Sequence, residues 1–179
     1  TRFTYHPAGT SPNAGLPATT TNAAGEVTTF TQYDAAGRLL EAVLPSGRVV
    51  AFGYDLNGNV TRVSPVKNVW EDHGLGYSPV DLLSSYTPPD PGTGEPYAET
   101  SYTYTFDRQV DQVQSIVGGQ TSTLLDFEYD PNTGQLASLL TGADTYGFTY
   151  DRGRLDTVTG PGNVALEHEW DGFLPLSVT

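Results

Sequence analysis

The sequence predicts an all-β protein in which tandem antiparallel β-hairpin repeats form one long curled sheet. Two observations carry this prediction. One is a short motif that recurs at nearly constant spacing, and the other is a composition with 11 Tyr, 7 Phe, 20 Gly and 13 Pro among 179 residues. Aromatic residues favour strands, whereas Gly and Pro favour turns, so this composition is typical of many short strands joined by tight turns.

The motif stands twice in residues 32–63. An aromatic residue and Asp are followed by Gly three residues after the Asp, first as Tyr33-Asp34 with Gly37 and then as Tyr54-Asp55 with Gly58. The Asp carboxylate accepts a hydrogen bond from the backbone two residues on, and Gly adopts a positive φ without a Cβ clash, as a type I turn followed by a left-handed residue requires. Each motif therefore predicts the end of a strand and a hairpin turn. A second turn is predicted at 44–47, so one repeat contains two strands and two turns.

The predicted elements follow the chain in order. Residues 1–25 are predicted to be an irregular N-terminal part, in which the strand Arg2–Tyr5 precedes a long turn or irregular connection over 10–24. Residues 26–179 are predicted to be the repeat sheet. Within it, 87–96 contain four Pro and two Gly, which predicts a surface excursion because such a segment does not fit the interior of a sheet.

Later copies of the motif are looser. Aromatic members are predicted at positions 33, 54, 77, 106, 129, 150 and 170. The residues predicted to form the structural repeat motif are Tyr33, Asp34, Gly37, Tyr54, Asp55, Gly58, Tyr129, Asp130, Gly134, Tyr150, Asp151, Gly153, Trp170 and Asp171. Tyr102, Tyr104 and Phe106 alternate with Thr, which predicts a strand with one aromatic face. Recurrence at this spacing is typical of repeat proteins.

One feature does not fit a regular strand. Val60 and Val63, like Leu136 and Leu139, are three residues apart, which places them on opposite faces of an ideal strand. Either both faces of the sheet are partly covered or a β-bulge intervenes.

Residues 33–39 read Tyr-Asp-x-x-Gly-Arg-Leu, and the chain resembles the YD repeats of the Rhs family over about residues 26–179. The resemblance implies hairpins laid side by side in one sheet that spirals into a hollow shell, as in Rhs toxins, the B and C components of insecticidal toxin complexes, and teneurins. It implies a non-catalytic structural segment whose partners are the remaining repeats and an enclosed toxin or other cargo. It also implies a bacterial protein that is secreted or at the cell surface. The autoproteolytic segment of Rhs proteins is not matched, so no cleavage activity is expected.

Charge and composition exclude several classes of function. The net charge of −13, from 21 acidic and 8 basic residues, disfavours binding to nucleic acid or to an anionic membrane. No Cys is present for disulfides or thiolate chemistry, and no apolar run approaches the roughly 18 residues of a membrane span. Met is absent, also at position 1, which suggests a piece of a longer protein. Edge strands of such a piece would be free to pair, so we expect self-association that strengthens with salt and with falling pH.

The residues that could form a metal or catalytic site are better explained by structural roles. Asp55, Asn57 and Asn59 resemble the start of a calcium loop, but Val60 stands where that loop needs Gly, so turn capping is favoured. The three histidines, His6, His73 and His168, do not have metal-binding spacing. We therefore predict no catalytic residue, no metal and no cofactor.

Two alternatives to a structural segment remain. One is an extracellular carbohydrate- or protein-binding repeat module, for which the aromatics of 102–106 are a candidate sugar platform, although an aromatic ladder is the commoner use of such a pattern. The other is an enzyme of unrecognised type, in which acidic pairs such as Asp151 and Asp156 would do acid/base work, although nothing else in the sequence converges on them.

Overall fold

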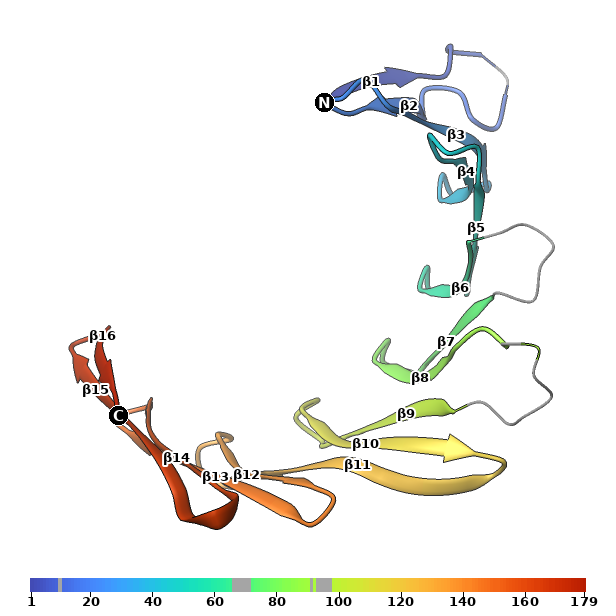
Figure 1. The fold of residues 1–179 in the computed structure, drawn as a ribbon. Coiled ribbons are helices and arrows are strands. Elements are labelled where there is room, and N and C mark those ends of the chain that lie inside the picture. The colour runs from blue at the N-terminus through green and yellow to red at the C-terminus, as the bar shows by residue number, and fades with distance from the viewer. Residues whose placement is uncertain (10, 66–71, 91, 93–97) are drawn as a thin grey trace. The chain divides into compact units, whose positions relative to one another are not determined.

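The computed structural model describes residues 1–9, 11–65, 72–90, 92 and 98–179 (Figure 1). Within these ranges the regular elements are sixteen β-strands and one short 3₁₀ helix, η1 (Pro161–Asn163). The chain forms two units, Thr1–Glu99 and Thr100–Thr179. The all-β prediction is therefore confirmed.

The strands of the first unit are β1 (Arg2–Tyr5), β2 (Pro17–Thr21), β3 (Val27–Tyr33), β4 (Leu39–Val43), β5 (Val49–Tyr54), β6 (Val60–Ser64), β7 (His73–Tyr77) and β8 (Leu83–Thr87). Strand β9 (Glu99–Tyr104) begins at the boundary. The second unit continues with β10 (Val110–Val117), β11 (Gln120–Tyr129), β12 (Leu136–Thr141), β13 (Asp144–Asp151), β14 (Arg154–Gly160), β15 (Val164–Asp171) and β16 (Leu174–Val178).

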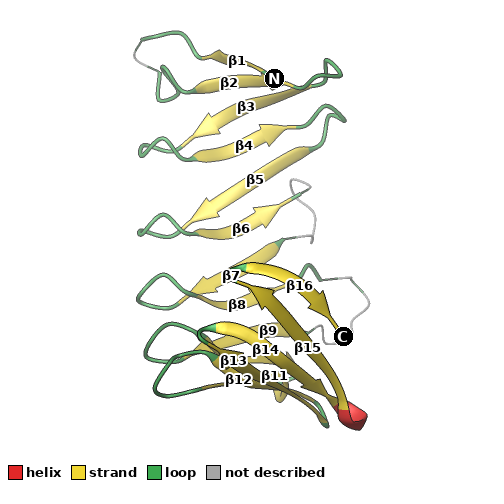
Figure 2. Ribbon diagram, turned by 90° about the vertical axis from the view of Figure 1, so that its left-hand side faces the viewer, coloured by secondary structure: helices red, strands yellow, loops and turns green. Residues whose placement is uncertain are grey.

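In each unit the order of strands in the sheet is their order in the chain, and the recorded pairs are antiparallel. Consecutive hairpins thus lie side by side in one open layer. Figure 2 shows the β3–β4, β5–β6 and β7–β8 turns along one edge of the first unit and the β2–β3 and β4–β5 turns along the opposite edge. This arrangement is the tandem hairpin sheet that the motif spacing predicts.

Hairpins that end in a repeat turn contain one extra residue at the same place in the second strand. In β5–β6, Tyr54 is opposite Val60 and Gly53 is opposite Arg62, so Thr61 has no partner. Equivalent β-bulges lie in the other recorded pairs of this kind, at Ala18, Leu40, Ser84, Ala137, Asp156 and Leu176. A bulge of this type explains the apolar spacing of three, because Val60 and Val63 are opposite Tyr54 and Phe52 and share their face.

The two faces of the sheet differ in chemistry. Directly opposed residues of antiparallel strands lie on one face, and the opposed row Phe148, Val158 and Leu166 in the second unit is apolar. The neighbouring row, Thr149, Thr157 and Glu167, is polar. We call these the aromatic face and the polar face. In the first unit the aromatic face likewise contains the opposed pairs Phe52–Val63 and Leu75–Tyr86.

The described part of the sheet has almost no buried core. Among the described residues only Ala42 and Ser64 are buried, each with 4% of its surface exposed. The accessible surface is 11701 Å², whereas a globular protein of 19.2 kDa is expected to expose only about 8,400 Å². Side chains on both faces are therefore half-buried against their neighbours within one layer.

Two predictions of strand position are corrected. Strand β9 ends at Tyr104, and Phe106 is fully exposed in the following turn. The repeat aromatic is thus Tyr104 and not Phe106, because Thr105 already occupies the first position of the turn. The stretch 10–24 is not simply an irregular connection, since it contains β2, which pairs with β1 and β3.

Two further predictions are not tested by the described residues and remain predictions. In the Pro-rich excursion at 87–96, residues 91 and 93–97 lie outside the described residues. The division of the chain at residue 25 stays a prediction.

Candidate functional site

The repeat turns are built around a carboxylate that accepts backbone hydrogen bonds. The Asp34 N–H donates to the Arg38 carbonyl at 2.9 Å, and the Gly37 N–H donates to the Asp34 carbonyl at 3.0 Å. Asp34 Oδ1 accepts the N–H groups of Ala36 and Arg38, each at 2.9 Å. Gly37 has a φ of 78°, the left-handed conformation that the turn requires. This is the type I turn with a following left-handed residue.

The second copy repeats this geometry. The Asp55 N–H donates to the Asn59 carbonyl at 3.0 Å, Asp55 Oδ1 accepts the Asn59 N–H at 2.9 Å, and Gly58 has a φ of 97°. Asp130 accepts two backbone N–H groups in a turn that is one residue longer and ends at Gly134.

These hydrogen bonds hold the three carboxylates in their ionised form. The backbone N–H of Arg38 is the main cause that lowers the pKa of Asp34. The side-chain amide of Asn59 lowers the pKa of Asp55, and the backbone N–H of Asn132 lowers that of Asp130. The carboxylates thus act as turn caps, not as proton donors.

Acid will weaken the fold through these caps. A group whose pKa is lower in the folded state stabilises that state fully above the unfolded pKa, about 3.9 for Asp, and loses this effect as the pH falls through the folded pKa. We expect the urea midpoint of unfolding to fall between pH 5 and pH 2. The triple variant with Asp34→Asn, Asp55→Asn and Asp130→Asn is the control, because Asn22 caps the β2–β3 turn in the same way. Its midpoint should fall less steeply, and equal slopes for the two proteins would contradict this role of the carboxylates.

Two turns use other residues for the same geometry. Ser78 Oγ accepts the Val80 and Leu82 N–H groups at 3.3 and 3.1 Å, and Asp81 occupies the glycine position with a φ of 62°. In the β9–β10 turn, Thr105 replaces the capping Asp and Arg108, with a φ of 64°, replaces Gly. A search for Asp and Gly misses these two turns. The signal that could have found them is a hydroxyl residue directly after the aromatic.

Asp151 and Asp171 occupy different positions from the caps. Asp151 is opposite Arg154 and Asp171 is opposite Leu174, so each is the last paired residue of its strand. Gly153 and Gly172 lie in the intervening two-residue turns with φ values of 83° and 60°.

The repeat aromatics join successive hairpins. The Tyr54 hydroxyl donates to the Leu39 carbonyl at 2.8 Å. The same bond is made from Tyr33 to Pro17 at 2.7 Å, from Tyr77 to Val60 at 3.0 Å, from Tyr129 to Val110 at 2.8 Å, and from Trp170 Nε1 to Leu155 at 2.8 Å. Where the strand pairing of the preceding hairpin is described, the acceptor carbonyl belongs to the residue just before the bulge of that hairpin. The backbone pairing of β4 with β5 stops at Glu41 and Ala51, so the aromatic supplies a hydrogen bond where the strands no longer pair.

Burial raises the pKa of Tyr33, Tyr54 and Tyr129, so these hydroxyls stay protonated and able to donate at neutral pH. Sequence reasoning identified the aromatics but not these bonds, since the acceptor depends on how one hairpin is placed against the next.

Side chains that follow the left-handed residue join successive turns. Arg38 Nη1 donates to the Asp55 carbonyl at 2.8 Å, and its guanidinium lies 4.8 Å from the centre of the Tyr54 ring. Asn59 Nδ2 donates to Asp81 at 2.7 Å. In the second unit the equivalent donors are Gln109 to Gly134 at 2.8 Å, Gln135 to Gly153 at 3.4 Å, and Arg154 to Gly172. Five of the described turns are therefore bonded to the next one along the edge.

The first hairpin is also a repeat. The His6 N–H donates to the Leu16 carbonyl at 2.8 Å, and the Gly15 N–H donates to the His6 carbonyl at 3.2 Å. His6 thus has the position of the capping Asp and Pro17 that of Leu39. The sequence pattern did not reveal this hairpin because its turn is expanded and begins with His.

The other candidate residues have structural contacts. His6 Nε2 is 3.1 Å from the Phe30 carbonyl, and His73 Nδ1 is 2.8 Å from the Tyr86 hydroxyl. Asp156 bonds to Thr149 at 3.2 Å, and Asp151 is 3.6 Å from Arg154. In the described ranges His168 is separate from any metal-binding group, because no three His, Cys, Asp or Glu residues are grouped to hold an ion. No helix there is long and apolar enough to cross a membrane.

The fold and its turns define a class, that of repeat proteins made of consecutive antiparallel hairpins in one layer. Residues 13–45 and 33–66 match the family model of the RHS repeat. The resemblance inferred from the motif is thus confirmed, and residues 13–66 carry RHS repeats.

Two solved structures are similar to the chain. The crystal structure of TcdB2-TccC3-TEV is 14% identical over 92% of this chain, with a TM-score of 0.41. The Tc holotoxin pore of Photorhabdus luminescens with a TccC3 mutation is 15% identical over 98% of this chain, with a TM-score of 0.44. This degree of similarity supports no functional conclusion, and the chain spans about 12% of each solved chain. Among curated proteins, none matches the sequence.

Proposed function

We propose that the chain is a non-catalytic wall segment of an Rhs-type β-shell, which encloses or scaffolds a toxin or another cargo polypeptide. The observation that carries this proposal is the single layer of hairpins, in which only Ala42 and Ser64 of the described residues are buried. A chain that exposes 11701 Å², about 3,300 Å² more than a globular protein of its mass, has the two accessible faces that a wall needs.

The contacts along the turn edge support the same function. Repeats after the first hairpin give a hydroxyl or indole N–H to the repeat before them or a side-chain donor to the turn after them, so the preferred partner of a repeat is another repeat. The proposed partners are accordingly the remaining repeats of a longer protein and an enclosed polypeptide. Secretion or display at a bacterial cell surface accompanies this proposal, and self-association through edge strands stays a prediction.

A repeat module that binds glycans or proteins through clustered aromatics is less well supported. The strongly exposed aromatics of the described residues are Phe3, Tyr5, Phe106 and Phe173, which lie on the first strand and in two separate turns. They are far apart in the order of hairpins and do not form the continuous patch that such a module requires.

Protection of the cargo from protease tests the proposal. The longer natural protein should be treated with protease with and without Gly58→Val, a change that distorts one repeat turn. We expect the cargo to be resistant in the parent protein and to be digested faster in the variant. A cargo that is digested at the same rate in both, and as fast as the isolated cargo polypeptide, would show that the repeats do not enclose it.

A further inference from the structure

One repeat departs from the bonding pattern of the others. Tyr150 occupies the position at which Tyr33, Tyr54, Tyr77 and Tyr129 donate to the preceding hairpin, yet no hydrogen bond of its hydroxyl is present among the described residues. The expected acceptor is the carbonyl of Leu136, which is opposite Tyr129 and directly precedes the bulge at Ala137. The hydrogen bond between the Tyr150 hydroxyl and the Leu136 carbonyl is therefore the one that is missing.

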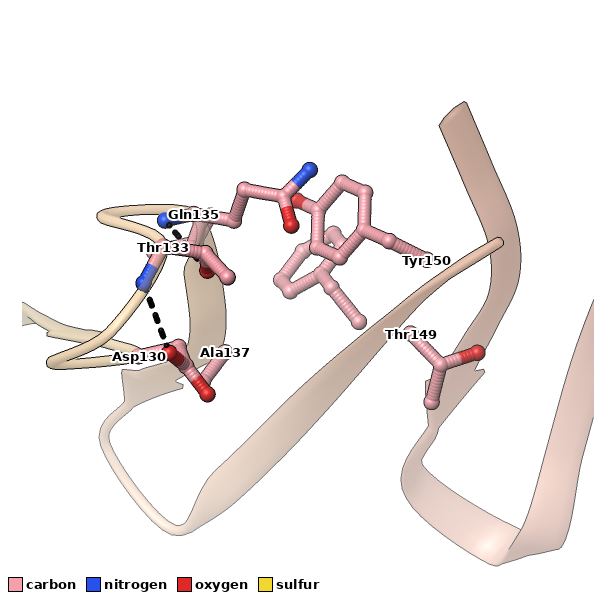
Figure 3. Close-up of a pocket in the computed structure, with 8 residues that line it drawn as sticks. Asp130, Thr133, Gln135, Ala137, Thr149 and Tyr150 are labelled. Carbon is pink, nitrogen blue, oxygen red and sulfur yellow. Dashed lines mark hydrogen bonds between the residues drawn. The ribbon is translucent and has the colours of Figure 1, made fainter. Parts of the chain in front are cut away.

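A cavity of about 300 Å³ lies at this place. Its lining includes Asp130, Thr133, Gln135, Leu136, Phe148 and Tyr150. Figure 3 shows the Gln135 side chain extended toward Tyr150, with the Asp130 turn on one side of the cavity. The turn from Asp130 to Gln135 is one residue longer than the turn from Asp34 to Arg38. This longer turn borders the cavity, so it lies at the same place as the hydroxyl without a bond.

The lining combines aromatic rings with hydrogen-bonding groups. Phe148 and Tyr150 are among the lining residues, and aromatic rings contact the apolar C–H face of a sugar ring favourably. Around them lie the hydroxyls of Tyr150 and Thr133 and the amide of Gln135. These groups both donate and accept hydrogen bonds, as the hydroxyls of a sugar require. A few polar groups around apolar walls are typical of small-molecule sites.

Charge and size restrict the ligand further. Asp130 in the lining is ionised at neutral pH because the Asn132 N–H and its neighbours lower its pKa, and the chain as a whole carries a net charge of −13. An anionic sugar is therefore disfavoured. The volume is at the lower end of ligand pockets, which span about 300 to 1,000 Å³, so it suits a single ring.

We propose that this cavity binds one pyranose unit of a neutral glycan, with Tyr150 and Gln135 as the residues that recognise it. The site belongs to one repeat, so it is distinct from a binding module repeated along the sheet. It does not depend on the proposed shell function.

Binding of methyl glycosides to the whole chain tests this proposal. The probes are the methyl β-glycosides of glucose, galactose and N-acetylglucosamine, with glucuronic acid as the anionic comparison, measured by saturation-transfer difference NMR and titration of amide shifts. A ligand of about 13 non-hydrogen atoms at ordinary ligand efficiency gives a Kd on the order of 1 mM. We expect at least one neutral glycoside to bind in that range and to shift amides of 130–137 and 148–150, and glucuronic acid to bind more weakly.

Matched variants locate the site. Tyr150→Phe keeps the ring and breaks no recorded hydrogen bond of the protein, so it should fold normally and weaken binding about fivefold, the loss of one hydrogen bond. Gln135→Ala should weaken it similarly, and because it also removes the bond to Gly153, its urea midpoint is measured beside its Kd. Tyr129→Phe is the control, because its hydroxyl bonds to Val110 and lies outside the cavity lining, and it should leave the Kd unchanged.

Three results would overturn the proposal. They are the absence of saturable binding of every neutral glycoside, binding of glucuronic acid that is equal or tighter, and binding that Tyr150→Phe and Gln135→Ala leave unchanged.

Discussion

Replacing Gly58 by valine will lower the free energy of unfolding by well over about 1 kcal/mol, the ordinary effect of a point substitution. Gly58 has a φ of 97°, a conformation that β-branched residues avoid because of their Cβ substituents. An added Cβ would lie at an ordinary contact distance, 3.7 Å, from Nη1 of Arg38, so the backbone conformation is the cause of the loss. Urea unfolding followed by circular dichroism measures the change.

Two neighbouring substitutions serve as controls. Gly58→Asn should cost much less than Gly58→Val, because Asn tolerates the left-handed region. Leu56→Val at the fully exposed tip of the same turn should stay within about 0.5 kcal/mol of the parent protein. If valine is tolerated as well as asparagine at position 58, the left-handed turn is not needed for stability.

Replacing Tyr54 by alanine will destabilise the chain by on the order of 2 kcal/mol, less than the roughly 3–5 kcal/mol for a fully buried aromatic because Tyr54 is only half-buried. The ring covers the space between two hairpins, contacts the Arg38 guanidinium at 4.8 Å, and gives its hydroxyl to the Leu39 carbonyl. Three interactions between successive repeats are thus lost together.

Tyr54→Phe separates the hydroxyl from the ring. It removes only the bond to Leu39 and should cost about 1 kcal/mol, the net value of one hydrogen bond. Thermal and urea unfolding of both variants give the comparison. Equal losses for the two substitutions would mean that the ring contributes nothing, in conflict with its place between the hairpins.

The local chemistry of the turns could be predicted from the sequence. Asp34 and Gly37 determine their turn through contacts within five residues, so their pattern is sufficient. The same reasoning failed at Thr105 and Arg108, because a hydroxyl can replace the carboxylate and the turn can force a positive φ on a non-glycine residue. The aromatic of that repeat was consequently placed at Phe106, two residues too late.

Contacts between hairpins could not be predicted from the sequence pattern. The bond from Tyr54 to Leu39 joins residues 15 apart in the chain, and its partner depends on the register of two hairpins and on the bulge between them. The spacing of Val60 and Val63 indicated either a β-bulge or a sheet covered on both faces. Only the pairing of β5 with β6 shows that the bulge is the correct explanation. The cavity beside Tyr150 could not be predicted either, because it depends on how Tyr150 lies against the preceding hairpin.

The single layer also determines how the fold responds to temperature. Folding removes about 58% of the surface that the unfolded chain exposes, compared with about 70% for a globular domain of this size. The heat capacity increment of unfolding grows with the apolar surface that becomes hydrated, so it should be smaller here than the usual 12–15 cal/mol/K per residue, roughly in proportion to the area. A smaller increment flattens the curve of stability against temperature, and the repeats then lose less of their stability on cooling than a protein with a closed core.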